Sequence, residues 1–437
     1  MKINKFLMKS AIVAALGGLL FGFDTAVISG AIQDLVADFQ LTPTSLGMTV
    51  ASALGGTILG AIFASVPGEY FGRRDSLRGL AILYFVSAVG CAGAWNWYVL
   101  IFFRIIGGLA IGGSSVLGPM YIAEIAPSKQ RGWLVGFFQF NIVLGILMAY
   151  FSNYLIGLAR FGVLEWRWML GVAALPAALF FVMLFGIPRS PRWLAKKGRI
   201  EEARKVLSMT GEERYEEELG MILESLRLEQ RLGANKLFIK AHSLPIFLAV
   251  SIGAFNQLSG INAVLYYLNY IFTSAGFGAV SASIQAIVVG TTLLIFTLVG
   301  MVTIDHLGRR VLLLVGSVGT ACCLTGVAAI FLVHKHEGLL LWLLVSYIAF
   351  FAFSQGAVIW VYISEVFPNS VRAKGQSLGS FSHWSFNALI SMLFPMVATI
   401  SGASPFFFFA GMMVLQFFVV LFVYPETKGL SLEKVQF

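Results

Sequence analysis

Two residues of opposite charge stand deep inside apolar stretches of this 437-residue chain, and the carboxylate of the two could bind and release a proton. Asp24 lies about 15 residues into the first apolar run, and Arg104 about 7 residues past Trp97 in the fourth, so helices would carry them about 22 Å and 10 Å from opposite faces of a hydrocarbon layer about 30 Å thick. These depths nearly coincide. A charge there costs at least about 2.5–3.5 kcal/mol unless it is paired or hydrated. A carboxylate that exchanges its arginine partner for a proton fits this placement, and a permanent ion pair between two helices is the alternative.

Neutral hydrogen-bonding side chains gather in a second place, the segment NQLSGIN of the seventh apolar run, 243–272. Asn256, Gln257 and Asn262 each offer donors and an acceptor, which is the chemistry needed to pair with adjacent hydroxyl groups of a ligand. Amides at mid-membrane depth are costly unless they face a polar cavity. The segment therefore indicates a site for a neutral, hydroxyl-rich ligand, with hydrogen bonding between helices as the alternative.

Charged motifs occur twice, about half a chain apart. Residues 121–132 read YIAEIAPSKQRG and residues 362–375 read YISEVFPNSVRAKG, so that a glutamate precedes an arginine by seven positions in both. A second pair, EYFGRR at 69–74 and DHLGRR at 305–310, has nearly the same offset. In an apolar chain this duplication predicts two similar membrane halves, as in many transporters.

The elements that must position these residues are membrane helices. The chain is 58% hydrophobic and 12% charged, against about 25% charged residues in soluble domains. Apolar runs of about 20 residues fall into twelve candidate spans, which predicts an all-α membrane protein. Threading twelve spans places most of the 30 lysines and arginines on the side of both termini, which is therefore expected to be cytosolic. Their scatter over short loops argues against a nucleic-acid surface.

A charged segment divides the chain. From 188 to 241 the residues are rich in charge, with apolar positions at helical spacing, so we expect short cytosolic helices there. The predicted organisation is an N-terminal six-helix bundle at 1–187, the cytosolic helical linker at 188–241, and a C-terminal six-helix bundle with a short tail at 242–437. No His, Asp or Glu cluster has metal-ligand spacing within the spans, and no Ser/His pairing suggests catalysis. We therefore expect no enzyme, no metal and no cofactor.

A set of motifs in this order and spacing resembles the sugar porter family of the major facilitator superfamily, over almost the whole chain. Besides the duplicated motifs, the resemblance rests on GGLLFGFDTAVISG (17–30), RIIGG (104–108), PRSPRWL (188–194), NQLSGINAVLYY (256–267), WVYISEVFPNSVR (360–372) and PETKGLSLE (425–433). The family includes bacterial xylose–proton symporters and animal glucose facilitators. The resemblance implies two six-helix bundles around a central cavity that opens alternately to each side.

The resemblance also implies roles for individual residues. The implied sugar ligands are Gln139, Asn256, Gln257, Asn262, Trp360, His383, Trp384 and Asn387. Tyr266 and Tyr267 would form an outer gate, with anchoring at the membrane interface as the alternative. A cytosolic charge network, expected to form pairs between the two halves when the inner side is closed, would contain Arg73, Glu124, Arg131, Arg192, Asp305, Arg309, Glu365 and Arg372.

Three positions depart from the family's pattern. Glu69 and Tyr70 stand where an Asp-Arg pair is usual, and Arg189 stands where the segment PESPR has a glutamate. Both departures are expected to weaken the cytosolic charge network. His383 replaces the amide usually found before the tryptophan of the eleventh span, which alters the implied sugar site.

These observations predict a proton-coupled monosaccharide symporter, for a pentose or a hexose, working by alternating access. We expect it in the bacterial inner membrane as a monomer, with a sugar, a proton and lipid as its partners. An uncoupled sugar or polyol facilitator is the main alternative. Facilitators of the family generally have a neutral residue at the position of Asp24, so the resemblance favours a proton symporter. A transporter-like sugar sensor is a further alternative, which would need a signalling domain or a long tail.

Overall fold

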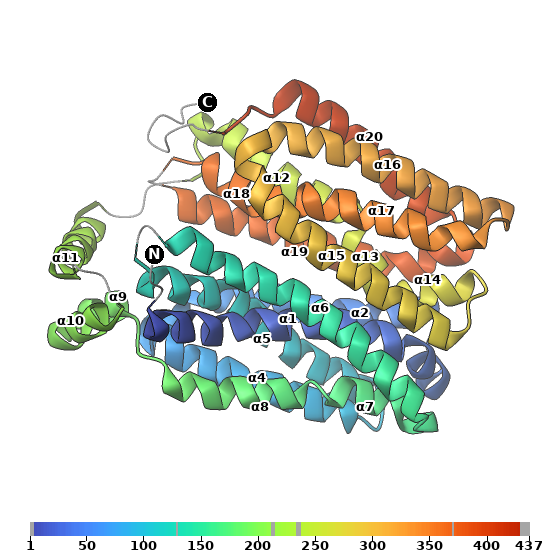
Figure 1. Ribbon diagram of the computed structural model, residues 1–437, viewed down its shortest axis with the longest axis horizontal. Coiled ribbons are helices and arrows are strands. Elements are labelled where there is room, and N and C mark those ends of the chain that lie inside the picture. Colours follow the sequence, from blue (N-terminus) through green and yellow to red (C-terminus); the bar gives the residue numbers. More distant parts are fainter. Residues whose placement is uncertain (1–3, 128–129, 211–214, 233–236, 369–370, 429–437) are drawn as a thin grey trace. The chain divides into compact units, whose positions relative to one another are not determined.

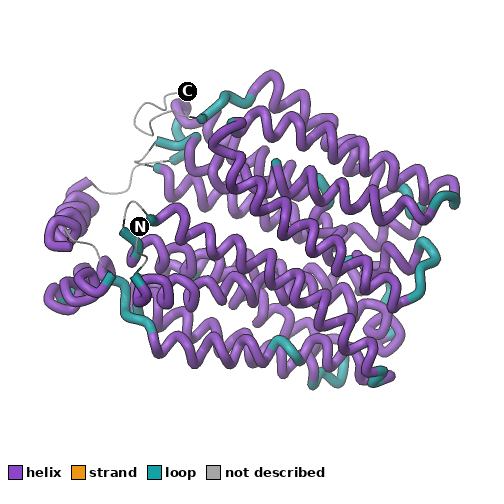
Figure 2. The backbone as a smooth tube through the Cα atoms, in the orientation of Figure 1, coloured by secondary structure: helices purple, strands orange, loops and turns teal. Residues whose placement is uncertain are grey.

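The computed structural model describes residues 4–127, 130–210, 215–232, 237–368 and 371–428, and every regular element in them is a helix (Figures 1 and 2). The first part of the chain forms α1 (Lys5–Phe39), α2 (Pro43–Phe63), α3 (Ser65–Tyr70), α4 (Arg73–Ala92), α5 (Trp97–Ile125), α6 (Arg131–Ala159), η1 (Gly162–Leu164), α7 (Glu165–Gly171), α8 (Ala174–Met183) and η2 (Leu184–Gly186). The charged segment forms α9 (Pro191–Lys196), α10 (Ile200–Met209), α11 (Tyr215–Leu232) and η3 (Lys240–His242).

The remaining helices form the C-terminal part. They are α12 (Ser243–Leu258), α13 (Ile261–Tyr266), α14 (Leu268–Ser274), α15 (Ala279–Leu307), α16 (Arg309–Val333), η4 (Glu337–Leu339), α17 (Leu340–Phe353), α18 (Gln355–Glu365), α19 (Arg372–Ile400) and α20 (Ser404–Val423). Within the described residues, twelve helical stretches are long and apolar enough to cross a membrane. The prediction of an all-α membrane protein with twelve spans is confirmed.

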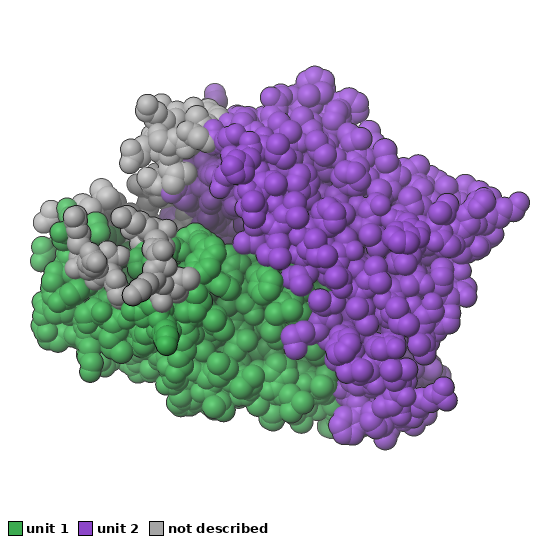
Figure 3. Space-filling view, in the orientation of Figure 1, with its two compact units in different colours: residues 1–24, 55–146, 170–235 green, residues 25–54, 147–169, 236–437 purple. Residues whose placement is uncertain are grey.

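Contacts divide the chain into two compact units that do not follow the halves of the sequence (Figure 3). Unit 1 contains residues 1–24, 55–146 and 170–235, and unit 2 contains 25–54, 147–169 and 236–437. The helices α1, α2 and α6 therefore each contribute to both units. Tyr150, on α6, shows how the outer part of the first half belongs to unit 2, because its hydroxyl donates to the carbonyl of Leu265 at 2.8 Å.

Each unit has its own apolar core. In unit 1, buried side chains of α1, α4, α5, α6 and α8 pack together, with Phe138 and Phe180 among the largest. In unit 2, α12, α16, α18 and α20 enclose a core that includes Tyr362 and Phe367. The short helices α9, α10 and α11 form a third small core around Trp193, as expected for surface helices with one apolar face.

Candidate functional site

The two membrane-buried charges are an ion pair within unit 1. Arg104 on α5 reaches Asp24 on α1, with its Nη1 atom 3.2 Å from Oδ2 and 3.4 Å from Oδ1. The arginine side chain is 4% exposed and the aspartate side chain 19%. Nε of Arg104 is buried without a hydrogen-bond partner, so the guanidinium satisfies only part of its bonding capacity on this carboxylate.

Hydroxyl groups of α4 surround this pair. A Cβ atom added to Gly107, on α5, would lie 2.5 Å from Oγ of Ser87 and 4.0 Å from Oδ1 of Asp24. Only glycine leaves room for both groups at this point. One helical turn away, the hydroxyls of Tyr84 and Ser114 are hydrogen-bonded at 2.8 Å. The carboxylate therefore stands among neutral polar groups beside a single strong cationic partner.

The seventh span, expected from a single apolar run at 243–272, is broken into separate helices. The helix α12 ends at Leu258, and α13 begins at Ile261. Between them Gly260 has φ +84°, which side chains other than glycine rarely adopt, and a Cβ there would lie 2.3 Å from the ring of Phe409. The carbonyl of Ser259, freed by the break, accepts a 2.9 Å hydrogen bond from the hydroxyl of Tyr347.

The amide side chains meet at this break. Nε2 of Gln257 lies 3.0 Å from Oδ1 of Asn256 and 3.2 Å from each ring nitrogen of His383. Its Oε1 accepts a 2.9 Å hydrogen bond from Asn262. Nδ2 of Asn256 lies 3.4 Å from the carbonyl of Gln355. These residues form one buried network, here called the amide cluster (Asn256, Gln257, Asn262 and His383), which joins α12, α13 and α19.

Aromatic rings flank the amide cluster. The ring of Trp360, on α18, is 5.0 Å from that of His383, with 55° between their planes. Trp384, the next residue on α19, is also 5.0 Å from His383 but perpendicular to it. Trp360 is 38% exposed, whereas Trp384 is 4% exposed. Part of Trp360 is therefore accessible beside the amide cluster, whereas Trp384 is buried.

The remaining predicted sugar and gate residues are placed differently. Asn387 is fully buried, and its Nδ2 lies 3.3 Å from the hydroxyl of Tyr266. Tyr267 is also fully buried, donates to the carbonyl of Ser391 at 2.9 Å and stacks on Phe394. In this structure both tyrosines therefore pack inside unit 2. Gln139 is half-buried on α6 and belongs to unit 1.

The predicted charge network forms the same contacts twice, once in each half. In the first half, Arg73 pairs with Glu124 at 2.9 Å, and the hydroxyl of Ser190 donates to the same carboxylate. The hydroxyl of Tyr121 donates to the carbonyl of Pro188 at 2.8 Å. Each of these contacts lies within unit 1.

The second half repeats this arrangement within unit 2. Arg309 binds Glu365 through two nitrogens, at 2.7 and 3.0 Å, and the hydroxyl of Thr427 donates to that carboxylate at 2.6 Å. The hydroxyl of Tyr362 donates to the carbonyl of Pro425 at 3.2 Å. The duplication seen in the sequence is therefore a duplication of side-chain contacts, and the pairs described here form inside each half.

Other residues of the predicted network have separate partners. Asp305 pairs with Arg309 at 3.0 Å. Arg192 reaches the hydroxyl of Ser225 at 3.5 Å, and Arg372 donates to the carbonyl of Phe367 at 3.3 Å. The side chain of Arg131 lies outside the described residues.

Two polar residues were missed by the sequence analysis. Gln355, at the start of α18, is 1% exposed, and its Oε1 is buried without a hydrogen-bond partner next to Asn256. The polar triplet SQG, 354–356, interrupts the tenth apolar run and could have marked it. Burial alone would raise the pKa of Glu426, but the backbone N–H groups of four residues donate to its carboxylate and lower that pKa below its usual value.

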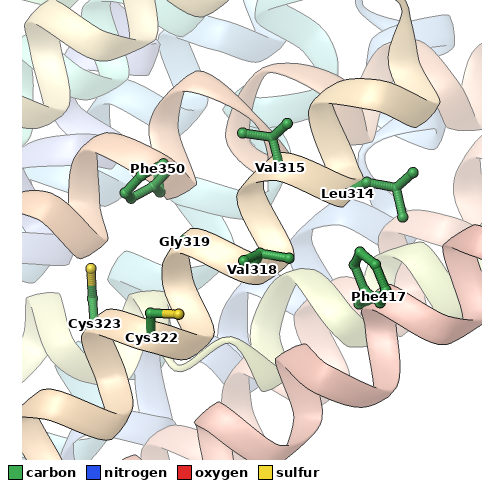
Figure 4. Close-up of a pocket in the computed structure, with 8 residues that line it drawn as sticks. All are labelled: Leu314, Val315, Val318, Gly319, Cys322, Cys323, Phe350 and Phe417. Carbon is green, nitrogen blue, oxygen red and sulfur yellow. The ribbon is translucent and has the colours of Figure 1, made fainter.

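An apolar cavity in unit 2 does not fit the sugar chemistry. It has a volume of about 520 Å³ and is lined by Leu314, Val315, Val318, Gly319, Cys322, Cys323, Phe350 and Phe417 (Figure 4). These side chains offer almost no hydrogen-bonding groups for hydroxyls. Across the described part of the chain, no three His, Cys, Asp or Glu residues are grouped so that they could hold a metal ion.

Comparisons with known proteins agree with this architecture. Residues 10–437 match the family described as sugar (and other) transporter. The chain is 36% identical to the arabinose-proton symporter of Bacillus subtilis, over 99% of this chain and 94% of that protein. It is also 36% identical to the D-xylose-proton symporter of Escherichia coli, over 99% and 96%.

Solved structures of the Escherichia coli xylose transporter are similar throughout. Its inward open conformation matches with a TM-score of 0.88 and 34% identity, covering 98% of this chain and 99% of that one. The same transporter bound to 6-bromo-6-deoxy-D-glucose matches with a TM-score of 0.82 and 35% identity, covering 99% of each chain.

Proposed function

Because this chain belongs to the sugar transporter family, we propose that it carries a monosaccharide, a pentose or a hexose, together with a proton across the membrane by alternating access. It is a multi-pass protein of the bacterial plasma membrane and a transporter rather than an enzyme. The observation that carries the coupling is the buried pair of Asp24 and Arg104.

The proton acts through this pair. When Asp24 is charged, its attraction holds Arg104 on α5 against α1. When Asp24 binds a proton, the attraction is lost and the guanidinium must find another partner or water, because an uncompensated buried charge costs about 3–5 kcal/mol. The packing of α1 against α5 can therefore differ between the two protonation states, and this difference couples the proton to the movement of the helices.

The sugar is bound at the amide cluster. Its hydroxyls would replace the present bonds among Asn256, Gln257, Asn262 and His383, each of which can donate and accept. The C–H face of the sugar ring would lie on the exposed face of Trp360. Gln355, Gln139, Trp384 and Asn387 are proposed as secondary contacts.

The orientation follows from charge. Threading the twelve spans places most lysines and arginines on the side of both termini, so we propose that this side faces the cytosol. The duplicated contacts around Glu124 and Glu365 are proposed to bias the equilibrium between outward-facing and inward-facing states. We propose that one copy of the chain is the working unit.

Uptake into proteoliposomes tests the function. Radiolabelled xylose, arabinose, glucose and myo-inositol would be offered with and without an imposed pH gradient. We expect at least one monosaccharide to accumulate above its external concentration when the outside is acidic, and only to equilibrate without the gradient. Equal uptake in both conditions would identify an uncoupled facilitator.

A second test addresses the binding site. Gln257→Ala removes the centre of the amide cluster and should weaken sugar affinity by about 1–3 kcal/mol in calorimetry, because its partners lose a hydrogen bond. Gln416→Ala is the matched control, since Gln416 is an equally buried glutamine, 1% exposed, on α20. An equal loss of affinity in both variants would place the sugar site elsewhere.

A further inference from the structure

Three arginines share one carboxylate at the linker end of unit 1. Oδ1 of Asp75, on α4, lies 2.9 Å from Nε of Arg74 and 2.8 Å from Nη1 of Arg78. Its Oδ2 lies 2.8 Å from Nη2 of Arg189, which precedes α9. We call these three residues the arginine cluster (Arg74, Arg78 and Arg189). It carries three positive charges against one negative charge, so two positive charges remain.

The neighbouring carboxylates already have partners. Glu69 pairs with Lys196 at 3.1 Å, and Glu124 pairs with Arg73. Glu202, whose pKa is lowered mainly by its hydrogen bonds to Arg199, is committed to that residue. Arg189 also contributes to the lowered pKa of Glu202, but the hydrogen bonds of this carboxylate go to Arg199, so it offsets only part of the excess charge. The remaining positive charge of the arginine cluster can therefore be balanced by an anion from outside the protein.

A further cation lies beside the cluster, and backbone carbonyls orient two of its arginines. A Cβ atom added to Gly186 would be 3.0 Å from Nζ of Lys9, which places this ammonium next to the same short segment, η2. Arg74 and Arg78 donate to the carbonyls of Ile187 and Leu184, at 3.3 and 3.1 Å. Nε of Arg78 has no hydrogen-bond partner.

The second half of the chain has a carboxylate at the position where the first half has Arg189. Pro425-Glu426-Thr427 in the second half corresponds to Pro188-Arg189-Ser190 in the first, as the matching bonds of their flanking residues show. Glu426 accepts from the first backbone N–H groups of α16, at 2.9 and 3.0 Å. Arg189 has no acceptor and cannot do the same for α4. The first half has therefore exchanged an anion for a cation at this position.

The cluster borders a surface suited to lipid. The guanidinium of Arg78 lies 4.0 Å from the ring centre of Phe185, which is 59% exposed. Val182 and Leu179, on the same side of α8, are 64% and 55% exposed. These apolar side chains end the sixth candidate span, Gly162–Gly186, and α8 packs directly on α4 (Figure 1). The charges thus stand where hydrocarbon gives way to headgroups.

We propose that the arginine cluster binds the phosphate of an anionic phospholipid in the leaflet at the linker end of the protein. Guanidinium groups bind phosphate oxygens through paired N–H donors, and the acyl chains would lie along the exposed side chains of α8. The phosphate supplies a negative charge in the first half, which has Arg189 where the second half has Glu426. A free phosphate ion shares the headgroup chemistry but would gain nothing from the apolar border.

Native mass spectrometry of the full-length protein tests this proposal. The purified protein would be exposed to equal amounts of phosphatidylglycerol and phosphatidylcholine in detergent. Wild type should retain phosphatidylglycerol in preference, and Arg78→Gln and Arg189→Gln should each reduce that retention about fivefold, as expected for one basic residue near an anionic surface. Arg204→Gln is the matched control, because Arg204 is an exposed arginine paired with Glu201 and Glu216 on the linker helices.

Two further arms make the outcome decisive. Added inorganic phosphate should not displace the lipid, and if it does so at concentrations near that of the lipid, the site binds free phosphate instead. Arg189→Lys keeps the charge and should retain most of the binding, which separates a charge effect from misfolding. Equal retention of both lipids by wild type, or unchanged retention in both glutamine variants, would overturn the proposal.

Discussion

Asp24 and Arg104 combine two properties at the scale of single residues. Both are buried, so the energy of their interaction is large, and yet the arginine uses only one of its nitrogens on the carboxylate. A fully satisfied bidentate pair would be a rigid strut between α1 and α5. A partly satisfied one can be broken by a single proton and leaves donors for a second partner. This geometry favours a switch over a permanent ion pair.

We expect Asp24→Asn to abolish proton-driven accumulation while sugar binding and counterflow remain measurable, because an asparagine side chain cannot bind a proton and so cannot alternate between a charged and a neutral state beside Arg104. Transport would be measured in proteoliposomes with an imposed pH gradient. Asp38→Asn is the matched control, since Asp38 lies on the same helix but near its end, 3.8 Å from Arg167. Undiminished accumulation by Asp24→Asn would show that the coupling carboxylate lies elsewhere.

His383→Gln should keep proton-coupled uptake but change the ranking of pentoses and hexoses. The imidazole ring lies 3.2 Å from Gln257 and 5.0 Å from Trp360, so it contributes to both the polar and the apolar side of the proposed site. A glutamine can still accept from Gln257, but it has a different shape and one more donor. The measurement is competition of unlabelled sugars with labelled uptake. Loss of coupling at unchanged affinity would instead make His383 a proton carrier.

Broken helices position the amide cluster at the scale of elements. The seventh span is interrupted at Gly260, and the tenth is interrupted at Ser354, between α17 and α18. At each interruption, backbone and side-chain groups that a continuous helix would bond internally are available to a neighbouring helix. Asn256, beside the break of the seventh span, reaches the carbonyl of Gln355, beside the break of the tenth. Irregular backbone in a membrane is tolerated where it lines a polar site.

Gly260→Ala should lower the thermal stability of the purified protein by about 1–3 kcal/mol and weaken sugar binding with it. The new methyl group must adopt φ +84° and would lie 2.3 Å from the ring of Phe409, so strain and overpacking add. Gly411→Ala, on α20, has no heavy atom within 4 Å of the added Cβ and is the control. An unchanged melting temperature in Gly260→Ala would contradict the left-handed turn at the break.

The repeated contacts around Glu124 and Glu365 express the internal duplication at the scale of the whole molecule. Each glutamate accepts from an arginine and from a hydroxyl in the segment that follows the last helix of its own half. The duplicated motifs thus form the same arrangement in both halves. Because each arrangement ties the sixth span of a half to its other helices, it stabilises that half as a body.

We expect Glu124→Gln and Glu365→Gln to destabilise the protein to a similar extent, by about 1–3 kcal/mol each, because each removes the mostly buried carboxylate that pairs with a buried arginine. Of the carboxylates paired with Arg309 in the described residues, Asp305 then remains, and its side chain is exposed. Thermal unfolding monitored by circular dichroism measures this effect. Glu201→Gln removes an exposed partner of Arg204 and should have an effect within about 0.5 kcal/mol. A clear inequality between the first two variants would show that the two halves differ in their reliance on the contact.

Much of this structure could be predicted from the sequence, because hydrophobic length and paired motifs are strong signals in a membrane protein. The twelve spans follow from apolar runs, and the shared depth of Asp24 and Arg104 from simple counting. The break at Gly260 was not foreseen, since an apolar run has the same composition whether its helix is continuous or interrupted. Gln355 was missed although the polar triplet SQG, 354–356, marks the break of the tenth span. The contact of Arg189 with Asp75 depends on tertiary packing, which no spacing encodes.

The proton pair and the amide cluster lie in different halves of the sequence, and this has a consequence for inheritance. A recombination event near the linker would separate the two functions cleanly, apart from the contribution proposed for Gln139. A gene joining the first half of this chain to the second half of a relative should encode a transporter with the proton coupling of one parent and the sugar specificity of the other. New sugar preferences could then spread among bacteria without any loss of uphill transport on the way.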